Sequence, residues 1–285
     1  IVLYTALFSF AANQFVVQII KIKRKVAKQQ ELIEEQHNDI LDSINYAKRI
    51  QHAILPSTDQ WEKNLPNSFV LYIPQDVVAV DFYWMSEGSD TVLFAAADCT
   101  GHGVPGAMVS VVCNNGLNRS IREFGLTAPG KILDKVRELV VEELSASNED
   151  VKDGMDIALI AKKGNTIEYA GAHNPLWVIR SGADEIEEIK ANKQPIGKFD
   201  NSSEFATHEL QMNSGDLIYI FSDGFADQFG SNDNKKYKSK RFKQFLLGIA
   251  NESMQDQRES LHKEFTDWKG EMEQLDDICI IGVRF

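Results

Sequence analysis

Hydrophobic and polar residues follow two different patterns along this chain, and Pro56 separates them. Residues 21–55 contain neither glycine nor proline and consist mainly of residues that favour helices, and Pro56 would end such a helix. An alternating spacing of three and four links Val26, Gln29, Ile33, Gln36, Ile40, Ser43, Ala47, Ile50 and Ile54. This stripe predicts a helical linker over residues 21–56 that forms a parallel, dimeric coiled coil. For residues 44–55, an amphipathic helix lying on its own domain is the alternative.

The first twenty residues are more apolar. Residues 1–20 carry no charge, and a helix needs ~20 apolar residues to cross a bilayer. A basic cluster follows at once, as is typical of a cytoplasmic flank: Lys21, Lys23, Arg24, Lys25 and Lys28. We therefore expect a transmembrane or apolar helix at residues 1–20 that anchors the full-length protein in the inner membrane, with the remaining domain in the cytoplasm. Polar residues interrupt the run, so a soluble helix in a partner's groove is the alternative.

Beyond Pro56, short apolar runs typical of strands alternate with longer periodic runs typical of helices. The predicted strands are Phe69–Ile73, Val77–Trp84, Val92–Ala97, Ile157–Lys162, Thr166–Ala170, Leu176–Arg180, Ala206–Leu210, Leu217–Phe221 and Ile278–Phe285. The predicted helices are Val104–Glu123, Pro129–Ser145, Ser239–Ile249 and Met254–Trp268. Short turns such as residues 163–165 join neighbouring strands, which predicts antiparallel pairing. The pattern alone predicts an α+β domain over residues 57–285.

Five aspartates stand at or near the ends of the apolar runs. They are Asp81, Asp98, Asp223 and the adjacent Asp276 and Asp277. Carboxylates that converge in a site of low dielectric constant repel one another unless a divalent cation neutralises them. Oxygen ligands without His or Cys suit Mg²⁺ or Mn²⁺. A turn or helix cap is the alternative for any single aspartate, but four such blocks in one chain favour a two-metal hydrolase.

The bulk composition narrows the function classes. The 285 residues are enough for one large core or two modest ones. The net charge of −12 gives no general attraction to nucleic acid, and the glycines form no nucleotide-binding fingerprint. Cys99, Cys113 and Cys279 are odd in number and lie in apolar runs, so we expect no disulfide and a reducing compartment.

Eight blocks follow one another in a characteristic order: YAKRIQHAILP, DFYW, DCTGHGVPGAM, DGMDIAL, YAGAHNPLW, PIG, SDGFADQFG and DDICIIGVRF. Over roughly residues 46–285, this order resembles the SpoIIE-type branch of the PPM family of metal-dependent protein serine/threonine phosphatases. The resemblance implies two packed antiparallel β-sheets flanked by helices. It also implies hydrolysis of phosphoserine or phosphothreonine on a protein, such as an anti-sigma-factor antagonist in a bacterial partner-switching pathway.

The resemblance assigns a role to each aspartate. Asp98 would bridge two divalent cations, Mn²⁺ or Mg²⁺, and the backbone carbonyl of Cys99 would help to hold one of them. Asp223 and Asp276 would complete the other site, and Asp81 would serve the metal beside Asp98 directly or through water. Asp277 would support the site, although the sequence leaves open which of the adjacent pair points inward. The cation pair would activate a water for attack on the phosphoester.

The other polar residues of these blocks receive weaker assignments. His102, four residues after Asp98, is a candidate general acid, with a turn histidine as the alternative. Asp153 and Asp156 are expected to support the site without binding metal. His173 is interpreted as a loop residue without function.

One position departs from the family pattern. Val80 stands before Asp81 where the family usually has glycine, and its β-branched side chain adds bulk beside the site. A pseudophosphatase that transmits a signal without catalysis is therefore the alternative function. A metal-dependent nuclease or cyclase shares the carboxylates, but the acidic balance and the absence of a basic groove disfavour it.

Overall fold

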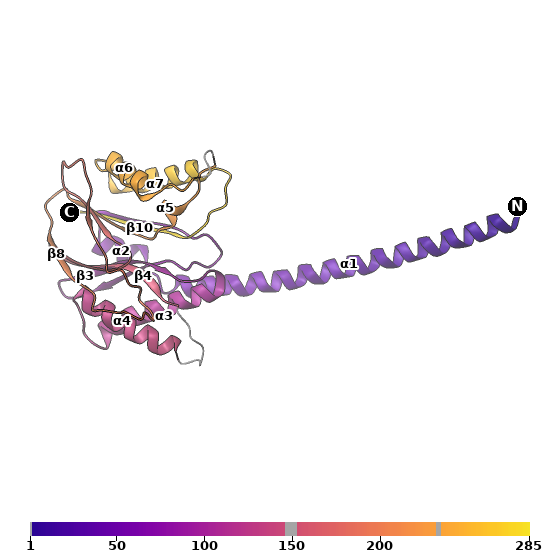
Figure 1. Ribbon diagram of the computed structural model, residues 1–285, viewed down its shortest axis with the longest axis horizontal. Coiled ribbons are helices and arrows are strands. Elements are labelled where there is room, and N and C mark those ends of the chain that lie inside the picture. The colour runs from indigo at the N-terminus through magenta and orange to yellow at the C-terminus, as the bar shows by residue number, and fades with distance from the viewer. Residues whose placement is uncertain (1, 146–152, 232–234) are drawn as a thin grey trace. The chain divides into compact units, whose positions relative to one another are not determined.

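The computed structural model describes residues 2–145, 153–231 and 235–285. These residues form two compact units, of which one ends at Ala47 and the other begins at Lys48. Helix α1 (Val2–His52) is continuous over its 51 residues (Figure 1). In the single chain, the stripe residues Val26, Ile33 and Ile40 are 46, 64 and 58% exposed.

The membrane-spanning segment expected at residues 1–20 gains no support. Across the residues that the structure describes, no helix has a run long and apolar enough to cross a membrane. The interrupting residues Ser9, Asn13, Gln14 and Gln18 lower the mean hydropathy of the run.

The last residues of α1, from Lys48 on, belong to the second unit. Gln51 is only 5% exposed. Its side-chain amide donates to the Ala79 carbonyl and, at 3.1 Å, to the Ser110 hydroxyl, and it accepts the Ala79 N–H at 3.0 Å. The end of the helix is therefore bonded to the segment that leads into Asp81.

Two five-stranded antiparallel sheets form the centre of the second unit. The first sheet has the order β1 (Ser68–Ile73), β10 (Ile278–Arg284), β9 (Leu217–Phe221), β6 (Leu176–Ile179) and β7 (Glu187–Ile189). The second has the order β2 (Phe82–Glu87), β3 (Val92–Cys99), β4 (Met155–Lys163), β5 (Thr166–Ala172) and β8 (His208–Gln211). Each pairing within them is antiparallel, which confirms the predicted fold class.

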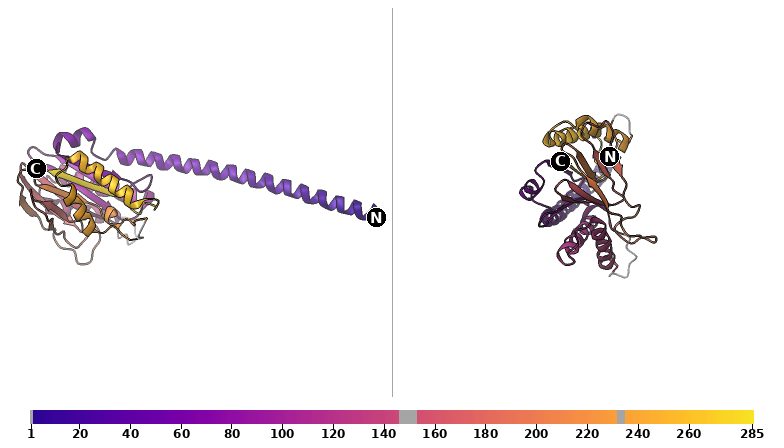
Figure 2. Two further views of the ribbon diagram at one scale, coloured as in Figure 1. Left: turned by 90° about the horizontal axis from the view of Figure 1, so that it is seen from above. Right: turned by 90° about the vertical axis from the view of Figure 1, so that its left-hand side faces the viewer.

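Helices cover the outer face of each sheet, as Figures 1 and 2 show. Helices α3 (Gly103–Arg122) and α4 (Pro129–Leu144) pack on the second sheet, and α6 (Ser239–Ile249) and α7 (Met254–Lys269) pack on the first. Two short helices, α2 (Thr58–Asn64) and α5 (Gly224–Asp227), complete the unit. A buried apolar layer lies between the sheets, and one further layer lies under each helix pair. The central strands of the two sheets are covered on both faces. They are therefore apolar almost throughout.

The predicted strand at Val77–Trp84 begins too early. β2 starts only at Phe82, because the N–H groups of Val80 and Asp81 donate to the Asp277 carboxylate instead of to a strand. The short elements α2, α5 and β7 were not predicted, since three to seven residues carry too little periodicity to stand out.

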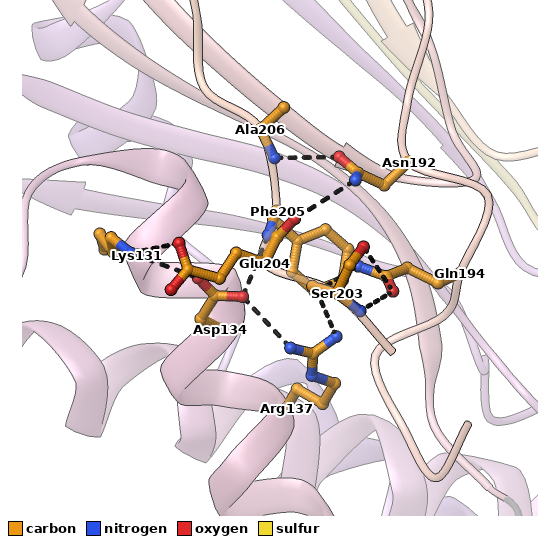
Figure 3. Close-up of polar contacts among 9 residues, drawn as sticks. All are labelled: Lys131, Asp134, Arg137, Asn192, Gln194, Ser203, Glu204, Phe205 and Ala206. Atoms are coloured by element: carbon orange, nitrogen blue, oxygen red, sulfur yellow. Dashed lines mark hydrogen bonds and ion pairs between the residues drawn. The ribbon is translucent and has the colours of Figure 1, made fainter. Parts of the chain in front are cut away.

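The long connection from β7 to β8 is held on α4 by a polar cluster (Figure 3). Asp134 accepts the Phe205 N–H at 3.1 Å and contacts Arg137 at 3.3 Å. Arg137 in turn donates to the Ser203 carbonyl at 2.9 Å. The same connection bonds to the start of β4 through a backbone pair between Met155 and Ile196, at 2.9 and 2.8 Å. It thereby fixes the strand end that carries Asp156.

Candidate metal centre

Three carboxylates lie in a row across the second sheet. Asp98, near the end of β3, is opposite Asp156 in β4. The register of β2 and β3 pairs Phe82 with Ala97, so the next position places Asp81 opposite Asp98. Directly opposed residues of antiparallel strands lie on one face with their Cβ atoms ~5 Å apart. The pairing of β3 with β4 therefore brings Asp98 and Asp156 together, and the end of the β2–β3 pairing directs Asp81 toward them.

Two further aspartates reach this point from the first sheet. Asp223 follows β9 and stands at the start of α5, while Asp276 lies just before β10. The turns that carry them approach closely at Gly224. A Cβ atom there would meet the Asp277 carbonyl and come within 3.2 Å of the Asp276 Cβ. The glycine of the SDG block is thus required by the contact between the two turns.

The electrostatics of this acid centre show mutual repulsion. Burial, followed by the charges of Asp223 and Asp276, raises the pKa of Asp98 to about 8. Partial desolvation and then the charge of Asp276 raise the pKa of Asp223 to about 6, although the residue as a whole is exposed. Burial also raises the pKa of Asp276, although the backbone N–H of Asp277 opposes the shift. The charge of Lys236 opposes this repulsion by lowering the pKa of Asp223. A divalent cation would remove this repulsion.

Asp81 is the most deeply buried of the four carboxylates proposed as metal ligands. It is 1% exposed, and within the described residues neither carboxylate oxygen has a hydrogen-bond partner. Burial and then the charge of Asp98 hold the pKa of Asp81 well above its usual range, against the effect of the nearby Ser222 hydroxyl. A buried ionised carboxylate without a partner costs several kcal/mol. These oxygens are therefore suited to receive a cation.

Asp277 has the opposite environment, although it is the neighbour of Asp276. Its carboxylate accepts the N–H groups of Gln75 at 2.6 Å, Val80 at 2.5 Å and Asp81 at 3.1 Å. Both of its oxygens are used. The sequence left open which of the adjacent pair points toward the metal, and these bonds argue against Asp277 as a direct ligand. Its carboxylate holds the segment that carries Asp81.

The residues fit a hard divalent cation by donor type and charge, but they do not form a ready-made cage. No group of three or more His, Cys, Asp or Glu side chains among the described residues is disposed to hold a metal ion as it stands. Cys99 is buried, and burial raises the pKa of its thiol, which therefore stays neutral in the metal-free protein. Its backbone carbonyl stays a prediction.

The two histidines near the acids differ in their contacts. His102 is exposed and precedes α3, where its side chain makes no capping bond. Nδ1 of His173 lies 2.9 Å from Oδ1 of Asp156, and its backbone has a left-handed φ of 54°. Such a φ is uncommon outside glycine. Sequence reasoning missed the His173–Asp156 pair, and the only signal was the GAHNP block.

The turn after Asp98 is supported by Asp153. The Thr100 hydroxyl donates to the Asp153 carboxylate at 2.9 Å and accepts the Gly154 N–H at 3.1 Å. Burial raises the pKa of Asp156, and the neighbouring His173 lowers it. The expected supporting role of Asp153 and Asp156 stays a prediction, and these bonds favour it.

Val80 is accommodated by a neighbour on α3. Its side chain is 6% exposed and belongs to the core beneath α3 and α4. A Cβ atom on Gly106 would collide with Cγ1 of Val80. The extra bulk at position 80 therefore fills space that Gly106 leaves open.

Comparison with known proteins places this geometry in a family. The sequence model described as Stage II sporulation protein E (SpoIIE) matches residues 88–285. This chain belongs to the SpoIIE family. Its SpoIIE match and its two-layered antiparallel sheets confirm the expected SpoIIE-type PPM phosphatase domain, which carries the PP2C fold.

Individual relatives agree with this assignment. The solved SiaA-PP2C domain of Pseudomonas aeruginosa is 31% identical, with a TM-score of 0.78, over 87% of this chain and 98% of that one. Phosphoserine phosphatase RsbU of Bacillus subtilis is 22% identical over 66% of this chain. The matched region spans 55% of the length of RsbU. The solved PP2C phosphatase domain of SpoIIE from Bacillus subtilis, with part of its regulatory domain, has 20% identity and a TM-score of 0.62. It covers 76% of this chain and 61% of that one, and supports the fold alone.

Proposed function

We propose that this chain hydrolyses phosphoserine or phosphothreonine on a regulatory protein, as the output domain of a bacterial signalling protein. The observation that carries the proposal is the acid centre, in which the buried Asp81 carboxylate has no hydrogen-bond partner among the described residues and Asp98 faces like charges. The printed activity of the relative RsbU supports the substrate class. An anti-sigma-factor antagonist is the proposed substrate protein.

Asp98, Asp81, Asp223 and Asp276 would hold two divalent cations, Mn²⁺ or Mg²⁺, with the Cys99 carbonyl as a further ligand. When bound, the cations would supply a water nucleophile at neutral pH and neutralise charge on the phosphoryl oxygens. The chain's own contribution is positional. Asp277 holds the Val80–Asp81 backbone, and Asp153 holds the turn after Asp98.

Two histidines compete as the donor of a proton to the leaving group. His102 follows Asp98 in the same turn, while His173 is oriented by Asp156. Replacing each by alanine tests the assignment. The proton donor's variant loses turnover on an alkyl phosphoserine substrate far more than on p-nitrophenyl phosphate, whose leaving group needs no proton. Equal losses on both substrates would contradict a proton-donor role.

The decisive experiment is a phosphatase assay of the purified chain. We expect turnover of a phosphoserine peptide with Mn²⁺ or Mg²⁺ and none with excess chelator. The alternative, a pseudophosphatase, predicts metal binding without turnover. An increase in melting temperature on adding Mn²⁺, measured in parallel, distinguishes a chain that binds metal without turning over from one that does not bind.

The exposed stripe of α1 supports a dimer through this helix. Light scattering of the whole chain and of a chain beginning at Lys48, which keeps Gln51, tests this proposal. We expect a dimer for the first and a monomer for the second. Equal masses relative to chain length would count against the coiled coil.

A further inference from the structure

Strand β1 is one of the two edge strands of its sheet, β7 being the other. It pairs with β10, and in the part of the chain that the structure describes no strand pairs with its other side. The Arg284 N–H donates to the Asn67 carbonyl at 2.8 Å, so Asn67 faces β10 with its backbone hydrogen-bonding groups. Backbone groups of an antiparallel strand point alternately to its two sides. Odd-numbered residues therefore bond to β10, whereas Val70 and Tyr72 direct their N–H and C=O groups away from it.

Two cavities lie along this free edge. One of about 240 Å³ has Val70 and Tyr72 in its wall and is bordered by α2 and α7. The other, of about 290 Å³, lies between Leu71 and α7. Gln255 and Arg258 line both cavities, so the two form one groove along β1.

One side of the groove is aromatic. Val70 and Tyr72 pack toward the core between the sheets, and Trp61 and Tyr83 line the same cavity. The rings of Trp61 and Tyr83 meet edge to face at 5.7 Å, and those of Tyr72 and Tyr83 at 5.5 Å. This rigid wall suits an aliphatic or aromatic side chain.

The other side is polar. Gln255, Arg258, Glu259 and His262 line the groove from α7 at the spacing of one helix face. From Gln255 to His262 these residues extend over seven helical steps, or ~10 Å along α7. An extended segment covers the same distance with about three residues. Arg258 is exposed and forms no ion pair with any described carboxylate, although Glu62 and Glu259 line the same two cavities.

We propose that this groove binds an extended segment of a partner protein, which adds a strand to the free edge of β1. Backbone bonds would form with Val70 and Tyr72. Successive side chains of an added strand point to opposite faces, so apolar residues would meet the Trp61–Tyr83 wall and an acidic residue would meet Arg258. The inference is independent of the phosphatase activity.

A second copy of this chain fits the groove less well than a single extended segment. Residues of α2 and α7 border the edge on both sides. Two copies pairing through β1 would have to accommodate both sets of bordering helices. A separate segment has no such flanks, and its acidic residue would complement Arg258.

Hydrogen exchange of the whole chain, resolved by residue, tests the proposal. The probe is a capped peptide in which valine and glutamate alternate over seven residues, added at up to 1 mM. In the free protein, the Val70 and Tyr72 amides should exchange rapidly and the Phe69 and Leu71 amides slowly. The peptide should slow Val70 and Tyr72 at least tenfold and leave the other two unchanged.

Matched variants connect this protection to the groove. Val70→Pro removes one outward N–H without removing a bond to β10, and it should abolish peptide binding while the fold persists by circular dichroism. Arg258→Gln should weaken binding of the glutamate peptide at least tenfold, but not that of a peptide with serine in place of glutamate. Lys263→Gln, on the same helix and 78% exposed, is the control and should change nothing.

Three results would overturn the proposal. The first is slow exchange of Val70 and Tyr72 in the free protein at every concentration, because the edge would then be closed. The second is protection that rises with protein concentration alone, which would assign the edge to a second copy. The third is no added protection with peptide, or binding that Val70→Pro and Arg258→Gln leave intact.

Discussion

Two charged regions of the second unit differ in how their charges are matched. In the polar cluster on α4, each carboxylate has a cation or a backbone N–H beside it: Lys131 pairs with Glu204 at 2.9 Å, and Arg137 with Asp134 at 3.3 Å. In the acid centre, Asp81, Asp98, Asp223 and Asp276 face mainly one another. The matched cluster stabilises a connection, whereas the repulsion in the acid centre can be relieved by protons or by a bound cation.

The same contrast occurs between adjacent residues. The Asp277 carboxylate accepts three backbone N–H groups, whereas among the described residues the Asp276 carboxylate accepts one, that of Asp277; both charges raise the pKa of Asp98. Position within a few ångströms thus decides whether a carboxylate supports the fold or the proposed chemistry. The following variants test that distinction.

Asp98→Asn should have the largest effect, because it removes a proposed ligand with little change in shape. We expect phosphatase turnover to fall about 10²–10³-fold, as when one stabiliser of transition-state charge is lost. The melting temperature without metal should not fall, since repulsion is relieved. The control is Asp134→Asn in the polar cluster, which should lower stability and leave turnover within a few-fold. Wild-type turnover in Asp98→Asn would contradict the assignment of Asp98 as a metal ligand.

Asp276→Asn and Asp277→Asn form a matched pair. Replacing Asp277 removes charge from three hydrogen bonds, so we expect its variant to lose about 2–4 kcal/mol of unfolding free energy. Replacing Asp276 should change stability by about 0.5 kcal/mol or less but strongly weaken Mn²⁺ binding. Urea unfolding and calorimetric titration with Mn²⁺ measure the two quantities. The reverse pattern would exchange the roles of the two residues.

The metal-free protein should become less stable as pH rises. The pKa of Asp98 is about 8 and that of Asp223 about 6 in the folded state, against ~4 in the unfolded chain. Between pH 4 and 8 the folded state therefore binds more protons than the unfolded state, so the unfolding free energy falls with pH. We expect the loss to grow across this range by up to about 1.4 kcal/mol per pH unit for each group that is protonated in the folded state and ionised in the unfolded chain. Asp98→Asn should flatten the curve, and saturating Mn²⁺ should abolish or reverse it; an equally steep slope in Asp98→Asn would contradict the shift.

Val80→Gly should have the smallest effect on chemistry. Because Val80 packs against Gly106, its removal leaves a cavity and adds backbone freedom, at a cost of roughly 1–3 kcal/mol. We expect no gain in turnover or metal affinity. A gain in either, measured beside the melting temperature, would show that the valine impairs the site. Val78→Ala, at another buried position of the same segment, controls for a general loss of packing.

Much of this protein is determined by local pattern. Apolar runs such as Leu217–Phe221 appear as strands with the predicted ends, and Ser239–Ile249 appears as the predicted helix. Burial on both faces makes such runs visible in the sequence. The four acidic blocks, their order and the family resemblance likewise come from the sequence, since glycines and aspartates at strand ends leave a local signature.

Other features depend on contacts between distant segments. Nothing in the neighbouring residues distinguishes Asp276 from Asp277; only the approach of residues 75–81, some 200 positions earlier, gives Asp277 its three donors. The His173–Asp156 pair and the partner of Val80 at Gly106 arise in the same way. The local sequence determines which strands and helices form. The charge balance, burial and packing of each side chain depend on the distant segments that the fold brings within a few ångströms.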